Sequence, residues 1–206
     1  MPSLYLISPP AIETELFASA LDDVLATNIA SAFQLRLKNT TKENIASAAN
    51  ALITICHRHG IPFILNDDPQ LAKNVNADGV HVGSDDTSIS EARAIMGANA
   101  MIGASCYDSI DLAIDACEAG ANYVSFGAFF DTPTKEPKAR PLPDIITKWI
   151  TNSNIPCAAI GGITPDNADL VSDADFICVI SAIWSQEDPV KAIEAFTNVT
   201  RPLETP

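Results

Sequence analysis

The stretch Pro62-Phe-Ile-Leu-Asn-Asp-Asp68 shows the pattern that decides the fold: a short apolar run that ends in polar side chains. Its apolar residues are continuous and do not alternate with polar ones, which is typical of a parallel strand buried on both faces. A helical pattern follows at residues 69–75. The stretch therefore predicts one strand, a polar strand end and one helix.

The same unit recurs on both sides of this stretch. We predict the other strands at residues 4–8, 32–37, 79–82, 101–105, 123–127, 157–161 and 176–181. We predict the other helices at residues 13–27, 42–59, 88–96, 109–119, 143–151, 165–171 and 188–197. Such an alternation fits an open doubly wound sheet or a closed barrel. Polar residues follow nearly every strand, whereas an open sheet would concentrate them at one switch point. We therefore predict an α/β fold, a single (βα)8 TIM barrel.

Length and charge limit the classes of function. The 206 residues suit one domain, so we expect residues 1–200 to form the barrel and residues 201–206 to form a loose tail. The net charge of −14 disfavours nucleic acid and anionic membranes as partners, because both need a basic surface. Scattered cysteines and the lack of a long apolar run lead us to expect a cytoplasmic protein. Whether it forms a homo-oligomer stays open.

Cations gather at the end of the strand at residues 32–37. Alternation places Gln34, Arg36 and Lys38 on one side of the strand. Charges that point into a barrel need a partner of opposite sign, because an unpaired buried charge is costly. An arginine with a nearby lysine suits a diphosphate, and a salt bridge within the protein is the alternative.

Acids follow the next two strands. Asp67 comes after the strand at residues 62–66, and Asp86 comes after the strand at residues 79–82. One or two carboxylates, completed by substrate phosphate, are the usual ligands of Mg²⁺. Asp67 and Asp86 are therefore candidate metal ligands. The alternative is that Asp68 and Asp86 cap the helices that follow.

Hydroxyl groups and glycines follow the remaining strands. Ser105 offers a hydroxyl to a phosphate, or it caps the following helix. The loop Thr132-Pro-Thr-Lys135 offers two hydroxyls and a cation, or it is an exposed turn. Gly161-Gly162 lets backbone N–H groups approach an anion closely. The loops after the seventh and eighth strands of such barrels often bind phosphate.

Eight short motifs, in this order, resemble the thiamine phosphate synthase family. They span about residues 4–183 and are Gln-Leu-Arg-x-Lys from Gln34, Asn66-Asp67, Gly-Val-His-x-Gly-x-x-Asp from Gly79, Gly-x-Ser from Gly103, Phe126-Gly127, Thr-x-Thr-Lys from Thr132, Ala-Ile-Gly-Gly-Ile from Ala159 and Ser-Ala-Ile from Ser181. Each motif is short, but the ordered set at barrel spacing is specific.

The resemblance implies a transferase of thiamine biosynthesis. Such an enzyme joins 4-amino-2-methyl-5-hydroxymethylpyrimidine diphosphate to 4-methyl-5-(2-hydroxyethyl)thiazole phosphate and releases diphosphate, with Mg²⁺ as cofactor. It implies that Asp67 and Asp86 hold the metal. It implies that the pyrimidine diphosphate is held by Gln34, Arg36, Lys38 and Asn66, and that Ser105 and Lys135 reach the leaving diphosphate. Arg36, Lys38, Ser105 and Lys135 are thus the expected catalytic residues. The expected thiazole phosphate ligands are Thr132, Thr134, Gly162, Ile180 and Ser181.

The chain also departs from the family pattern. Ser84 stands where the family usually has Gln, Leu37 where it often has Glu, and Asp131 where Pro is common. A thiazole tautomerase on the same barrel is one rival, but that relative uses a His at the position of Ala128 and lacks the metal acids. A non-catalytic paralogue that binds a thiamine precursor is the other rival.

Overall fold

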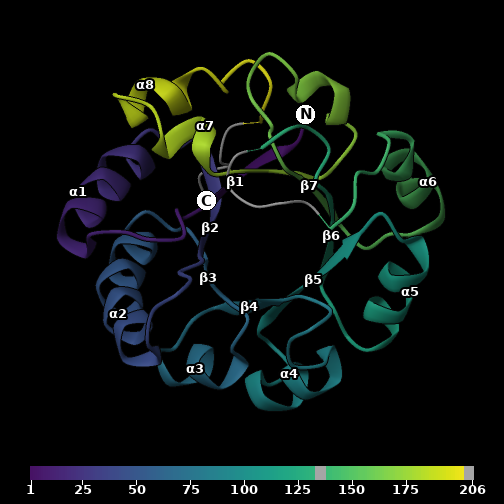
Figure 1. The fold of residues 1–206 in the computed structure, drawn as a ribbon, viewed down its shortest axis with the longest axis horizontal. Helices are drawn as coiled ribbons and strands as arrows, with labels where there is room; N and C mark the ends of the chain where they lie inside the picture. The colour runs from purple at the N-terminus through teal and green to yellow at the C-terminus, as the bar shows by residue number, and fades with distance from the viewer. Residues whose placement is uncertain (133–137, 202–206) are drawn as a thin grey trace.

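The strands of the computed structural model close into a barrel, which confirms the predicted (βα)8 fold (Figure 1). The structure describes residues 1–132 and 138–201. All eight strands are parallel to their neighbours and follow chain order around the barrel, with β1 paired to β8. They are β1 (Ser3–Ile7), β2 (Ala30–Leu35), β3 (Phe63–Asn66), β4 (Gly79–Val82), β5 (Met101–Tyr107), β6 (Tyr123–Gly127), β7 (Cys157–Ile160) and β8 (Phe176–Val179).

Helices surround the barrel and cover the outer face of the strands (Figure 1). They are α1 (Thr14–Leu25), α2 (Lys42–Arg58), α3 (Pro69–Asn74), α4 (Ile89–Met96), α5 (Ile110–Glu118), α6 (Asp144–Asn152), α7 (Ser181–Trp184) and α8 (Pro189–Glu194), with a 3₁₀ turn η1 (Ala168–Val171) between β7 and β8. Side-chain caps mark several helix starts, among them Thr41 before α2 and Ser88 before α4.

The last two units differ from the predicted elements. The helix predicted at residues 165–171 is a 3₁₀ turn, because Asn167 bonds the backbone of Thr164 and Gly162 in place of a regular helical turn. The strand predicted at residues 176–181 ends at Val179, and Ser181 begins α7. The apolar run there continues through strand and helix, so hydrophobicity alone does not mark the boundary.

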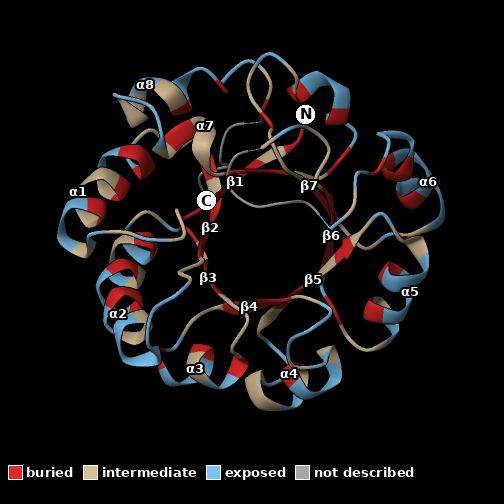
Figure 2. Cartoon of the chain, in the orientation of Figure 1, coloured by how far each residue is buried: buried red, intermediate tan, exposed pale blue. Residues whose placement is uncertain are grey.

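Two apolar cores lie on either side of the strands. The larger core fills the space between the strands and the helices, whose inner sides are buried (Figure 2). The smaller core fills the barrel interior and includes Tyr5, Ile64, Tyr123 and Cys178. Polar side chains are buried in the interior as well, namely Gln34, His81 and Ser125. The interior therefore combines apolar packing with polar groups that need hydrogen-bond partners.

The C-terminal end of the described chain lies against its start. The backbone N–H of Arg201 donates to the carbonyl of Pro2 at 2.9 Å, and its Nε donates to the Ser3 hydroxyl at 2.8 Å. Residues 202–206, which make up the rest of the predicted tail, lie outside the described residues. Within the described ranges, no helix is long and apolar enough to cross a membrane.

Candidate functional site

A cavity of about 200 Å³ lies at the C-terminal ends of β2 to β5. It brings together six of the residues predicted from the sequence: Arg36, Lys38, Asn66, Asp67, Asp86 and Ser105. Its other lining residues are His81, Gly83, Asp85, Tyr107 and Lys138. Parallel strands present their carboxyl ends at one face of the barrel, and this explains why residues far apart in the sequence meet here.

Asp67 forms an ion pair across the cavity with Lys38. It follows the last residue of β3 and has a left-handed backbone with φ of 70°, which is uncommon outside glycine. Its backbone N–H donates to the carbonyl of His81 at 2.8 Å. Lys38 is therefore paired within the protein, as the salt-bridge interpretation predicts.

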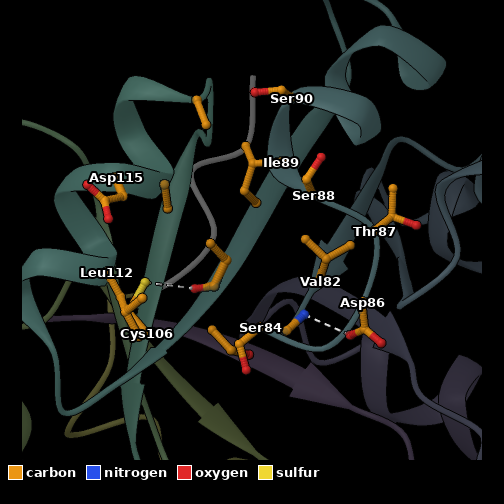
Figure 3. Close-up of a pocket in the computed structure, with 15 residues that line it drawn as sticks. Val82, Ser84, Asp86, Thr87, Ser88, Ile89, Ser90, Cys106, Leu112 and Asp115 are labelled. Atoms are coloured by element: carbon orange, nitrogen blue, oxygen red, sulfur yellow. Dashed lines mark hydrogen bonds between the residues drawn. The ribbon is translucent and has the colours of Figure 1, made fainter.

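Asp86 lies beside Asp67, and its Oδ2 accepts a hydrogen bond from the backbone N–H of Gly83 at 2.8 Å (Figure 3). Burial raises the pKa of Asp86 above its usual range, the nearby charge of Asp67 raises it further, and the Gly83 N–H opposes both. The pocket of Figure 3, about 290 Å³ between α4 and α5, shares Gly83, Asp86 and Ser105 with the first cavity.

The helix-cap alternative is right for one acid and wrong for the other. Asp68 does cap α3, because its Oδ1 accepts from the Leu71 N–H at 2.9 Å. Asp86 does not cap α4, whose N-cap is Ser88 in a capping box with Glu91. Asp86 is thus held at the cavity by the loop after β4.

The Asp67–Asp86 pair fits a hard divalent cation. Two carboxylates that share a site repel each other, and a cation between them removes that repulsion. Among the described residues, no group of three or more His, Cys, Asp or Glu side chains converges on one point. A two-carboxylate donor set is still what Mg²⁺ takes when waters and substrate phosphate complete its shell.

Arg36 enters the same cavity from the end of β2. Its backbone N–H donates to the buried Ser8 hydroxyl at 2.8 Å, which holds the end of the strand. Burial lowers the pKa of the guanidinium, and the charge of Asp67 counteracts this. Arginine nevertheless stays protonated at neutral pH, so the cavity holds a permanent cation near the acids.

Gln34 is only 3% exposed and lies below the cavity. Its Nε2 donates to Asn66 Oδ1 at 2.6 Å, and its Oε1 accepts from the Tyr5 hydroxyl at 3.2 Å. Asn66 lines the cavity. Gln34 therefore positions Asn66, a role that the sequence pattern did not separate from direct contact.

Ser105 reaches the cavity from β5, and its hydroxyl lies 2.9 Å from His81 Nε2. The alternative that Ser105 caps the next helix is wrong, because Ser109 caps α5. His81 is buried inside the barrel, and its burial lowers its pKa to about 4. Its imidazole is therefore neutral at pH 7.

Tyr107, Lys138 and Asp85 form a rim of the cavity that the sequence did not predict. Lys138 Nζ lies 2.5 Å from Asp85 Oδ2 and 5.1 Å from the centroid of the Tyr107 ring. The Tyr107 hydroxyl lies 3.2 Å from the hydroxyl of Ser84, one of the departures from the family pattern. Lys138 was not predicted to line this cavity because it comes from a loop far along the chain. The only signal was the run of basic residues after Thr132, namely Lys135, Lys138 and Arg140.

A second cavity, of about 30 Å³, lies at the ends of β7 and β8. It brings together four predicted residues: Thr132, Gly162, Ile180 and Ser181. Gly162 has φ of 67°, and a Cβ there would lie 2.3 Å from the carbonyl oxygen of Asp131. This close approach requires glycine. Thr134 and Lys135 lie outside the described residues.

Asp131, another of the departures from the family pattern, forms an ion pair with Arg140 at 2.8 Å. Both side chains are at least half exposed, so the pair neutralises the acid but contributes little stability.

Comparisons with known proteins agree on one family. The model of a family described as thiamine monophosphate synthase matches residues 4–183. A thiamine-phosphate synthase of Rhodospirillum centenum is 44% identical over 201 residues, which are 96% of this chain and 97% of the relative. One of Xanthomonas campestris pv. campestris is 43% identical over 196 residues, 94% of this chain and 93% of the relative.

The solved structures agree with this. The thiamine phosphate pyrophosphorylase from Pyrococcus furiosus superposes with a TM-score of 0.84 at 32% identity, over 96% of this chain and 94% of that one. A 3-hexulose-6-phosphate synthase, at 15% identity and a TM-score of 0.70, shares the fold alone. The extent and identity of the matches show that the chain belongs to the thiamine monophosphate synthase family.

Proposed function

We propose that this chain joins 4-amino-2-methyl-5-hydroxymethylpyrimidine diphosphate to 4-methyl-5-(2-hydroxyethyl)thiazole phosphate, with release of diphosphate. Its family membership makes it a transferase of the thiamine-phosphate synthase kind. The observation that carries the assignment of the site is the pair of cavities at one end of the barrel. One contains paired acids and cations, and the other is lined by glycine and hydroxyl groups.

The larger of these two cavities, at the ends of β2 to β5, suits the pyrimidine diphosphate. Arg36 and Lys38 supply positive charge, and Ser105 and Lys135 are proposed to reach the leaving diphosphate. Asp67 and Asp86 would hold Mg²⁺, which when bound supplies positive charge to the phosphate oxygens. Asn66, held by Gln34, would contact the pyrimidine.

The smaller cavity suits the phosphate of the thiazole. Gly162 leaves backbone N–H groups accessible to an anion, and Thr132 and Ser181 supply hydroxyls. Ile180 would pack against the ligand, and Thr134 would add a second threonine hydroxyl. We propose this site as metal-free, since its described residues carry no carboxylate.

The proposed chemistry needs no general base. The C–O bond to the leaving diphosphate breaks and its electron pair departs with the diphosphate, while the electron-rich aminopyrimidine carries the developing positive charge. The lone pair of the thiazole nitrogen then forms the new C–N bond. The protein must stabilise the leaving charge and hold the two rings close. Arg36, Lys38 and Lys135 serve the first need, and the smaller cavity serves the second.

The direct test is to incubate the protein with both substrates and Mg²⁺ and to measure thiamine phosphate. We expect product that disappears when a chelator is in excess. A protein that binds either substrate without making product would instead be the non-catalytic paralogue. Isomerisation of the thiazole without coupling would indicate the tautomerase, which Ala128 argues against.

A further inference from the structure

A continuous chain of hydrogen bonds crosses the barrel interior below the larger cavity. Its five contacts measure 2.6, 3.2, 2.9, 3.0 and 2.9 Å. They join one side chain from each of β1 to β6, in the order Asn66, Gln34, Tyr5, Tyr123, His81 and Ser105. The two ends, Asn66 and Ser105, line the cavity. The four inner members are each no more than 9% exposed.

The hydrogen bonds in this series all donate in one direction, because each tyrosine hydroxyl carries a single proton. Gln34 Oε1 can only accept a hydrogen bond, so the Tyr5 hydroxyl donates its single proton to Gln34. The oxygen of Tyr5 must then accept from the Tyr123 hydroxyl. Tyr123 has no second proton, so it accepts from Nδ1–H of His81.

The direction continues to Ser105. A neutral imidazole carries one proton, and here it is on Nδ1, so Nε2 accepts from the Ser105 hydroxyl. Ser105 then offers only lone pairs to the cavity. At the other end, Asn66 Oδ1 is bonded to Gln34, so Asn66 offers its NH₂ group.

The backbone at Gly103 leaves room for the contact between Tyr123 and His81. A Cβ on Gly103 would lie 2.4 Å from the Tyr123 hydroxyl oxygen and 2.5 Å from His81 Nδ1. Gly103 therefore makes room for the contact between the two rings at the centre of the barrel.

We propose that Tyr5, Tyr123 and His81 are positioning residues of a hydrogen-bond relay. This relay couples Asn66 at one end to Ser105 at the other. If Ser105 donates to a diphosphate oxygen, the Ser105 hydroxyl no longer donates to His81 Nε2. The imidazole then takes up a proton from the solvent of the cavity at Nε2, through Ser105, and returns its Nδ1 proton to solvent, so that Tyr123 donates to Nδ1. Tyr5 donates to Tyr123, and both amides turn over. Asn66 then presents Oδ1, an acceptor for the amino group of an aminopyrimidine.

The relay deepens the proposed function, since it rests on Ser105 meeting the diphosphate. It explains how one site recognises both ends of one substrate: the anion at Ser105 selects the acceptor face of Asn66. Donors and acceptors balance in both states, and the relay gains or loses no net proton.

The imidazole tautomer of His81 reports the direction, and ¹⁵N NMR of histidine-labelled full-length protein measures it. His57 and His59, which pair with Asp78 and Asp22, lie outside the relay and serve as internal references. We expect His81 as the Nδ1–H form alone and as the Nε2–H form with inorganic diphosphate and Mg²⁺. An Nε2–H form in the protein alone, or no change with saturating diphosphate, overturns the proposal.

Two variants separate coupling from a merely structural role. In Tyr5→Phe, Tyr123 has lost its acceptor and donates to His81, so we expect the Nε2–H form without any ligand. In Ser105→Ala, we expect the Nδ1–H form with or without diphosphate. An unchanged tautomer in Tyr5→Phe, or a diphosphate response in Ser105→Ala, contradicts the relay. The tautomer is read without turnover: a protein that makes thiamine phosphate with a fixed tautomer refutes only the relay, and one that switches without making product refutes only the proposed function.

Discussion

The two cavities at the end of the barrel handle charge in different ways. The larger one, at the ends of β2 to β5, contains three acids, Asp67, Asp85 and Asp86, and three cations, Arg36, Lys38 and Lys138. The described part of the smaller one contains no charged side chain and relies on the close backbone at Gly162. We propose that the two cavities bind their anions by separate means. A site in which two carboxylates lie close together gains from a metal, whereas a backbone site does not.

The largest loss of activity is expected from a substitution in the larger cavity. Asp67→Asn keeps the shape of the side chain but removes a proposed metal ligand and the partner of Lys38. We expect kcat to fall on the order of 10²–10³-fold, the range for loss of one strong charge-stabilising group. Steady-state rates at varied Mg²⁺ measure this.

Asp68→Asn is the matched control, because the neighbouring acid caps α3 and pairs with exposed Lys42. It should cost at most about 1 kcal/mol of stability, typical of a weakened cap, and keep kcat within about twofold. Equal loss of activity in both variants would contradict the assignment of Asp67.

The next largest effect is expected from a substitution that crowds the smaller cavity. Gly162→Ala places a Cβ 2.3 Å from the Asp131 carbonyl, so we expect KM for thiazole phosphate to rise about 10–100-fold, as the loss of 1.4 to 2.7 kcal/mol of binding implies. The Mg²⁺ dependence should stay unchanged.

Gly60→Ala separates backbone strain from crowding. Gly60 has nearly the same φ, 68°, but no atom lies within 4 Å of its added Cβ. Kinetics should be those of the wild type, with a modest loss of stability. A raised KM in Gly60→Ala as well would show that general destabilisation explains the effect.

A smaller effect concerns pH. The pKa of Asp86 is raised, mainly by burial, so the carboxylate protonates at higher pH than an ordinary aspartate. We expect Mg²⁺ affinity to weaken as pH falls through that pKa. An acid with a raised pKa in the folded state destabilises the fold when ionised, and stability returns as pH falls.

Asp86→Asn should therefore weaken Mg²⁺ binding while raising the Tm of the free protein, on the order of 1 °C. Calorimetry at neutral pH with and without Mg²⁺ measures both. A lower Tm in the absence of metal would show that the ionised Asp86 stabilises the fold.

The smallest effect concerns Asp131. Its pair with Arg140 is exposed, so Asp131→Ala should change stability by less than about 1 kcal/mol and KM for thiazole phosphate by less than about threefold. A tenfold change would mean that this departure from the family pattern alters phosphate binding directly.

The sequence predicted the strand ends better than the interior. Short apolar runs that end in polar residues located Asp67, Asp86 and Ser105, because side chains at carboxyl strand ends share one face. Tyr5 and Tyr123 escaped notice because an aromatic residue in a strand has the pattern of ordinary core. Only the fold shows that their hydroxyls meet at 2.9 Å. Lys138 was missed because loop paths do not follow from periodicity, and α7 was missed because its apolar residues continue those of β8.

The most direct test of the account is isothermal titration of each substrate separately, with Mg²⁺ and with excess chelator. The account predicts that the pyrimidine diphosphate binds only with Mg²⁺, whereas thiazole phosphate binds equally in both conditions. Loss of both in chelator, or loss of neither, would contradict the division into a metal-assisted cavity and a metal-free one.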